Sequence, residues 1–339
     1  MISALFRGLV GLILCQHAQG YSAADLLRAA RGGDTETVQA VLAENKVDTS
    51  MKYKEETPLH VAAAGGFIEV ARLLLESGVP ATVKNFNNTG PIVEAVLGDR
   101  ADMIELLHRH GADINGNVLK DEVHYPLIIV AAGEGKTAAI AKLLDLGVHV
   151  DSRSQPLSGL KHKVGDDTPL IAAGFQGQTG AMKLLLDRGA DPSLANRQGN
   201  TALHAATFAN KPSTLKFLLD RGVFNVSQTN QDGFSPVILA AHAGSDKCLR
   251  LLLKAGASVN TPPRIDFNPL IVSVRTYNQP LFKEVMLWSP DVNAYDSVNF
   301  TALYHSLSNN HHKMASQLLR KGAALGKQND YVKGIMDEW

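Results

Sequence analysis

The stretch TPLHVAAAGG, residues 57–66, decides the fold because related stretches return along the chain. They begin at Thr168 (TPLIAAGFQG), Thr201 (TALHAATFAN) and Ser235 (SPVILAAHAG). We call the residue at the place of Pro58 the repeat start. The repeat starts are Asp25, Pro58, Pro91, Pro126, Pro169, Ala202, Pro236, Pro269 and Ala302, and most of the steps between them are 33 residues. A fixed period of this size indicates a repeat architecture.

Each unit predicts a first helix with a defined beginning. The residue before the repeat start is often Thr, Ser or Asn, whose side-chain oxygen can accept from the free N–H groups of a first helical turn. Proline at the repeat start suits the first helical position, where its missing N–H costs nothing. Four residues further on, a small residue lets neighbouring helices pack closely, and only Val130 departs. The small residues are Ala29, Ala62, Ala95, Ala173, Ala206, Ala240, Ser273 and Ser306.

A second helix follows a short turn in each unit. It is amphipathic and ends in paired leucines, such as Leu74-Leu75 and Leu252-Leu253, which we expect to fill the core between units. A glycine then allows the left-handed conformation that closes a helix, and only Ser289 breaks this pattern. The glycines are Gly78, Gly111, Gly147, Gly189, Gly222, Gly256 and Gly322.

A unit of about 33 residues with a helix, a turn, a second helix and a protruding turn resembles the ankyrin repeat. The T-P-L-H and L-L-x-x-G-A-D motifs carry this resemblance. The resemblance covers about residues 22 to 325 and implies an all-α solenoid of about nine helix-turn-helix units with protruding β-turn fingers. We expect a signal peptide over 1–20, a repeat domain over 21–325 and a C-terminal cap or tail over 326–339. The repeats are expected near 22–54, 55–87, 88–122, 123–165, 166–198, 199–232, 233–265, 266–298 and 299–325.

The resemblance implies a protein that binds other proteins through a concave face and finger loops and catalyses nothing. The sequence offers no catalytic residue, cofactor site or metal site of its own. Lys plus Arg and Asp plus Glu number 33 each, so no basic field attracts nucleic acid. No apolar run reaches the roughly 18 residues that span a bilayer. We therefore expect protein partners, no nucleic acid, no membrane insertion after signal removal, and a monomer before binding.

Three features imitate chemical sites. The run Gly133 to Thr137 resembles the end of a phosphate-binding loop, but Val130 stands where the motif needs glycine. The histidines suggest a metal site, but His60 and His204 lie at the H of T-P-L-H, where the resemblance implies a structural hydrogen-bonding role. Cys248 stands where Val70 stands in the second unit, which predicts a buried thiol.

The opening MISALFRGLVGLILCQHAQG lies outside the repeats. One positive residue, a short apolar run from Gly8 to Cys15 and small residues before Tyr21 are typical of a secretory signal peptide. The alternative is a helix that caps the first repeat. With a signal, we expect export to the periplasm or secretion. With a capping helix, we expect a cytoplasmic adaptor or effector.

Partner binding is expected where units deviate from the repeat. The loop between Gly147 and Pro169 is nine residues longer than its counterpart after Gly78, and residues 151–167 within it carry four cationic or imidazole side chains. Enlarged loops on one face of a solenoid are often binding elements, although insertions are also tolerated without a role. The candidates in this enlarged finger are Arg153, Lys161, His162 and Lys163.

An aromatic series stands two residues before the repeat start. Phe234, Phe267 and Phe300 recur at intervals of 33, and Tyr53 and Phe86 lie on earlier turn tips. Aromatic side chains on a rigid surface can anchor a partner, but they can equally pack against the next unit. Both interpretations stay open.

The function expected from these features is a non-enzymatic, exported scaffold that binds a protein and inhibits, protects or localises it, as in self-protection. An enzyme with a cryptic site is the other class, and no residue favours it. Three sequons could accept glycans if the source is eukaryotic. They begin at Asn87, Asn225 and Asn299.

Overall fold

The computed structural model describes residues 21–44, 56–156, 165–261 and 267–324. The chain divides into two compact units, Met1–Ser152 and Arg153–Trp339. The proposed signal peptide and the tail from 326 onward lie outside the described residues. We describe each unit by itself.

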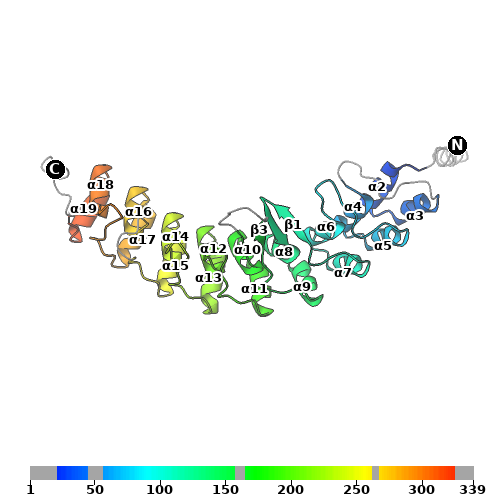
Figure 1. Ribbon diagram of the computed structural model, residues 1–339. Coiled ribbons are helices and arrows are strands. Elements are labelled where there is room, and N and C mark those ends of the chain that lie inside the picture. Colours follow the sequence, from blue (N-terminus) through cyan, green and yellow to red (C-terminus); the bar gives the residue numbers. More distant parts are fainter. Residues whose placement is uncertain (1–20, 45–55, 157–164, 262–266, 325–339) are drawn as a thin grey trace, which may run out of the picture. The chain divides into compact units, whose positions relative to one another are not determined.

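The first unit holds four helix pairs and a hairpin (Figure 1). Its pairs are α2 (Ala23–Gly32) with α3 (Thr35–Ala43), α4 (Pro58–Gly65) with α5 (Ile68–Glu76), α6 (Pro91–Leu97) with α7 (Ala101–Arg109), and α8 (Leu127–Gly133) with α9 (Thr137–Asp145). Strands β1 (Asn117–Lys120) and β2 (Val123–Pro126) stand between the third and fourth pairs.

The second unit begins with the short strand β3 (Gln155–Pro156) and continues with five helix pairs. They are α10 (Pro169–Gln176) with α11 (Thr179–Asp187), α12 (Ala202–Phe208) with α13 (Pro212–Arg221), α14 (Pro236–His242) with α15 (Asp246–Lys254), α16 (Pro269–Arg275) with α17 (Gln279–Leu287), and α18 (Ala302–Ser308) with α19 (His312–Arg320). The described residues are therefore mostly helical, as the resemblance predicted.

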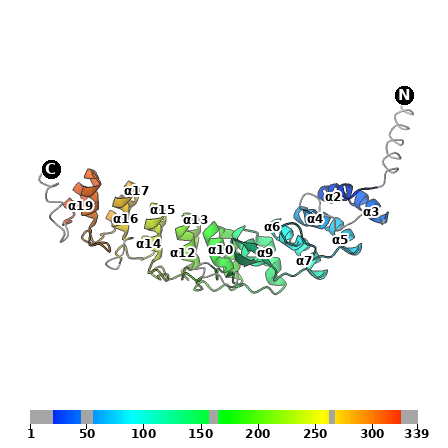
Figure 2. The same ribbon diagram turned by 45° about the horizontal axis from the view of Figure 1, so that its top comes forward.

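The helices of each unit form two layers (Figures 1 and 2). Within each unit, the first helix of a pair packs on the first helix of the next pair, as α10 does on α12 and α12 on α14. The second helices form the other layer, as α13 does with α15 and α15 with α17. Each pair therefore buries its apolar faces against the pairs on either side, which is the arrangement of a repeat solenoid.

The second helices pack through a fixed pattern of positions i, i+1 and i+4. In α5 these are Val70, Ala71 and Leu74, and all three are fully buried. Both leucines are buried in the pairs Leu74-Leu75 and Leu252-Leu253, whereas in the last pair Leu318 is fully buried and Leu319 is 40 % exposed. Cys248 occupies the first position of this pattern in α15 and is fully buried, as its alignment with Val70 predicted.

Buried histidines join neighbouring repeats within each unit. His204 lies between the Thr201 hydroxyl, 2.9 Å from Nδ1, and the Gln228 carbonyl, 3.0 Å from Nε2. A carbonyl oxygen can only accept, so Nε2 carries the proton and Nδ1 accepts from Thr201. His60 makes the same contacts with Thr57 at 2.8 Å and with the Thr89 carbonyl at 2.9 Å. The T-P-L-H histidine thus ties each of these helix beginnings to the next finger.

The hydroxyl of T-P-L-H therefore does not cap every helix. In α4 the Thr57 hydroxyl bonds the imidazole and makes no bond to a backbone N–H. The cap forms as predicted at two helices that lack the histidine: Thr168 Oγ1 accepts from Ile171 N at 3.3 Å, and Thr301 Oγ1 accepts from Tyr304 N at 3.3 Å. Ser235 also lacks the histidine but makes no side-chain cap.

The fourth pair differs from the prediction that its first helix starts at Pro126. Residues 117–126 form an antiparallel hairpin instead, with Val118 opposite Tyr125. Asp121 and Glu122 both have positive φ, as a tight two-residue hairpin turn requires. Helix α8 starts one residue later, at Leu127. The small-residue position consequently falls on Ala131, which is fully buried, and this explains why Val130 departs from the repeat.

A left-handed residue closes each of the second helices α5, α7, α9, α11, α13, α15, α17 and α19. At seven of these eight positions it is glycine, with φ between 68° at Gly222 and 96° at Gly78. At the eighth it is Ser289, whose φ is 49°. A side chain with a Cβ is strained in this region by about 1–2 kcal/mol.

Among the described residues, no helix has both the length and the apolar character needed to cross a bilayer.

We predict that replacing Ser289 by glycine raises the free energy of unfolding by about 0.5–1 kcal/mol, because it removes the backbone strain at φ 49°. The reverse change, Gly256→Ser, is the matched control and should lower the free energy of unfolding. Urea unfolding followed by circular dichroism measures both. A loss of stability in Ser289→Gly would contradict this account of the helix closure.

Burial lowers the pKa of the His204 imidazole, so the folded protein favours the neutral ring. The unfolded chain then binds more protons than the folded one as the pH falls below about 6.5. The stabilisation by neutral His204 is therefore complete above that pH and decreases below it. We predict that His204→Gln lowers the unfolding free energy by about 1–3 kcal/mol at pH 7.5 and by less at pH 5.

Urea unfolding at the two pH values measures this difference, with exposed His110→Gln as the control that should change stability little at either pH. An equal deficit for His204→Gln at both pH values would show that the neutral imidazole is not the stabilising form.

Candidate partner-binding surface

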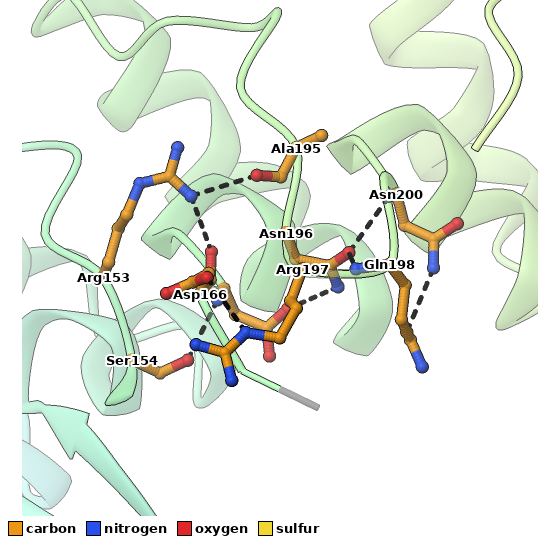
Figure 3. A network of polar contacts seen from close by, with 9 residues as sticks. Arg153, Ser154, Asp166, Ala195, Asn196, Arg197, Gln198 and Asn200 are labelled. Carbon is orange, nitrogen blue, oxygen red and sulfur yellow. Dashed lines mark hydrogen bonds and ion pairs between the residues drawn. The ribbon is translucent and has the colours of Figure 1, made fainter. Parts of the chain in front are cut away.

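The base of the enlarged finger is closed by backbone pairing (Figure 3). Ser154 N donates to the Asp167 carbonyl, and Asp166 N donates to the Ser154 carbonyl, each at 3.0 Å. The Ser154 side chain is fully buried, and its Oγ accepts from Asp167 N at 2.9 Å. These bonds hold residues 154 and 166–167 together, so the insertion leaves and rejoins the repeat at a fixed place.

Arg153 belongs to this base (Figure 3). Its guanidinium Nη1 donates to the Asp166 carbonyl and to the Ala195 carbonyl, both at 3.0 Å. The side chain thus connects its own finger to the next one. The structure gives Arg153 a positioning role within the protein, and its predicted contact with a partner stays a prediction. Lys161, His162 and Lys163 lie outside the described residues.

Neighbouring fingers of the second unit are joined by hydrogen bonds from asparagine side chains. The acceptors, Asp167 and Asn200, stand two residues before a repeat start. Asn196 Nδ2 donates to the Asp167 carboxylate at 2.8 Å, and Asn230 Nδ2 donates to Asn200 Oδ1 at 2.9 Å. Burial raises the pKa of the Asp167 carboxyl. The position two residues before the repeat start therefore carries a polar contact between fingers in the repeats that start at Pro169 and Ala202. In the later repeats the same position is phenylalanine.

The predicted aromatic series divides into two groups. The rings of Phe234 and Phe267 meet edge to face with centroids 5.0 Å apart. The Phe300 ring stacks on Tyr304 at 3.9 Å and meets His305 edge on at 5.9 Å. All three phenylalanines are partly buried, so each ring packs on neighbouring rings. Their predicted role as partner anchors stays untested.

Of the two candidates on earlier turn tips, only Phe86 lies within the described residues. Phe86 is 64 % exposed on the finger before α6. Tyr53 lies outside the described residues. Phe86 therefore offers an accessible ring in the first unit, as an anchor for a partner would need.

Sequence reasoning missed the most regular exposed row, which lies at the last turn of successive first helices. Phe175 on α10 and Phe208 on α12 are 46 % and 49 % exposed, and their ring centroids are 6.4 Å apart at an interplanar angle of 26°. The row continues to exposed His242 on α14, 6.5 Å from Phe208 and nearly parallel to it. We call Phe175, Phe208 and His242 the ring row.

The signal for the ring row was present in the sequence six residues after each repeat start. Ala64 and Leu97 occupy that position in the first unit, and Arg275 occupies it on α16. The aromatic series two residues before the repeat start supports the row, because the Phe267 ring meets His242 edge to face at 5.0 Å. The series and the row are thus joined through Phe267.

Among the described residues, no group of three or more His, Cys, Asp or Glu side chains lies close enough together to hold a metal ion. Burial raises the pKa of the Cys248 thiol, which disfavours the nucleophilic thiolate. The Gly133 to Thr137 run forms the end of α8 and the turn into α9, which is an inter-helix turn like those of the other pairs.

Comparisons with known proteins agree with this architecture. The family described as "Ankyrin repeats (3 copies)" matches residues 26–118 and 170–263. The chain is 27 % identical over 269 residues to "Ankyrin repeat and KH domain-containing protein mask-1" of Caenorhabditis elegans, which covers 78 % of this chain and 8 % of that protein. It is 30 % identical over 145 residues to "Ankyrin repeat and SOCS box protein 6" of Pongo abelii, covering 40 % and 32 %.

The crystal structure of the human ASB11 ankyrin repeat domain superposes with a TM-score of 0.56 at 24 % identity, over 69 % of this chain and 98 % of that one. This likeness shows the fold. The chain spans less than a tenth of the length of the mask-1 protein and about a third of the SOCS box protein. The repeated motifs, the stacked helix pairs and the family match together lead to one conclusion: the chain belongs to the ankyrin-repeat family.

Proposed function

We propose that this protein is an exported, non-enzymatic scaffold that binds one protein partner through the ring row and the adjacent fingers. Ankyrin repeats are protein–protein interaction scaffolds, and this part of the function follows from the family. The observation that carries the proposed site is the pair Phe175 and Phe208, whose rings are about half exposed on the neighbouring helices α10 and α12, which pack on each other.

Exposed aromatic rings on a rigid layer suit a binding role. Each ring has few rotatable bonds, so little conformational entropy is lost when a partner covers it. Helix α12, which carries Phe208, is fixed by neighbours on both sides, because it packs on α10 and on α14. Aromatic residues are also enriched among the residues that dominate binding energy at interfaces.

The proposed location is supported by the composition of the first twenty residues. A short apolar run follows one arginine, and small residues precede Tyr21. A scaffold exported with one partner would cover that partner's surface, and if the surface contains an active site, binding inhibits it. Self-protection against an enzyme of the same cell is the role that we propose for this covering.

We predict that Phe175→Ser with Phe208→Ser lowers partner recovery at least tenfold and leaves the melting temperature within about 2 °C of the unchanged protein, because half-exposed rings contribute little to folding. Phe234→Ser with Phe267→Ser is the matched pair. Its rings are more deeply buried than those of Phe175 and Phe208, so it should lower the unfolding free energy by about 1–3 kcal/mol. The measurement is affinity capture with the full chain from extracytoplasmic fractions, with thermal unfolding in parallel.

Recovery of no stoichiometric partner from that fraction would contradict the proposed function. Full recovery with the Phe175 and Phe208 variant would contradict the proposed site while leaving the scaffold role in place.

We also predict that the native protein begins at Tyr21 and is found in the extracytoplasmic fraction, because the small residues Ala18 and Gly20 fit the −3 and −1 places of a signal-peptidase site. N-terminal mass spectrometry of the protein isolated from its own cells measures this. An intact Met1 in a cytoplasmic fraction would favour the capping-helix alternative.

A further inference from the structure

The spacing of the ring row limits the shape of what can bind along it. The centroids are separated by 6.4 Å from Phe175 to Phe208 and by 6.5 Å from Phe208 to His242. In an extended strand, alternate side chains on one face lie about 6.6–6.8 Å apart. On a helix, the residues of one face recur on average about every 5.4 Å, because successive four-residue steps of about 6.0 Å turn steadily off that face. The row therefore matches an extended segment, one alternate side chain per ring.

The end of the row at α14 and α16 has a different character from its beginning. The position that holds a phenyl ring on α10 and α12 holds the imidazole of His242 on α14 and the guanidinium of Arg275 on α16. Both side chains are exposed. Among the described residues, no carboxylate lies within ion-pair distance of Arg275, so its charge is available to a partner.

The imidazole of His242 in the ring row is also held in place by the aromatic series. Phe267 meets His242 edge on at 5.0 Å with an interplanar angle of 73°, and Phe234 meets Phe267 at 77°. These contacts hold the imidazole between the Phe208 and Phe267 rings. A ligand that lies along the row therefore meets a preformed surface, apolar at α10 and α12 and cationic at α16.

We infer that the ring row binds an extended segment of the partner protein in which apolar side chains alternate opposite Phe175 and Phe208 and a carboxylate follows opposite Arg275. This inference rests on the proposed function and adds the conformation and chemistry of the bound segment. The apolar side chains are covered by the phenyl rings. The carboxylate pairs with the guanidinium, which presents planar donors suited to it.

The test selects random twelve-residue peptides displayed on phage against the full chain. The expected peptides carry apolar residues at alternate positions with Asp or Glu two or four positions beyond. A synthetic peptide of the selected sequence, followed by fluorescence anisotropy, should lose at least tenfold in affinity when Phe175→Ser and Phe208→Ser are combined. Leu287→Ser is the control in the same unit, because Leu287 is 76 % exposed on α17 away from the row.

The charge is tested by exchange. Arg275→Glu should weaken the acidic peptide at least tenfold, and a peptide with lysine in place of its acidic residue should recover affinity for Arg275→Glu. Circular dichroism checks that the variant is folded.

Three outcomes would overturn the inference: selected peptides with apolar residues at helical spacing, binding insensitive to the Phe175 and Phe208 changes, or no selected peptide. If any of these is found while affinity capture still recovers a stoichiometric partner, the extended-segment inference fails and the proposed function stands. If neither peptide nor partner is recovered, both fail.

Discussion

The structure depends on one constraint: a single helix pair cannot bury its own apolar faces. The fully buried side chains Val70, Ala71 and Leu74 of α5 lie in a layer that is covered only when the preceding and following pairs are present. Stability is therefore shared between neighbours. The buried histidines extend this dependence to the fingers, since His204 links a helix beginning in one unit to the Gln228 carbonyl in the next finger.

Because packing fixes the helices, the surface that they present can vary freely. The residue six places after each repeat start shows this freedom: it is Ala64 on α4, Phe175 on α10 and Arg275 on α16, while the residue four places after the start stays small. The enlarged finger likewise combines a fixed base with a variable segment. Ser154 and Arg153 fix its base, so the residues beyond the base can change without disturbing the stack. On the function proposed above, recognition and folding are carried by different positions of the same repeat.

Much of the fold could be predicted from the sequence, because the repeat start, the small packing residue and the closing glycine each report a local physical requirement. The prediction was wrong at Pro126, where ten residues that look like a connection pair as a hairpin and move the helix start to Leu127. Short pairing of this kind depends on tertiary contacts rather than local pattern. For the binding surface, the sequence predicted rings near the turn tips but not the ring row, since whether Phe175 faces solvent or a neighbouring helix is decided by how the repeats stack.

The central claim is that partner binding occurs on the ring row. The most direct measurement is the ¹⁹F NMR spectrum of full-length protein carrying fluorophenylalanine at Phe175, Phe208 or Phe86, recorded with and without the captured partner. The account predicts changed shifts at Phe175 and Phe208, with Phe86 less affected although it is the most exposed of the three. Unchanged shifts at Phe175 and Phe208 in a saturated complex would contradict it.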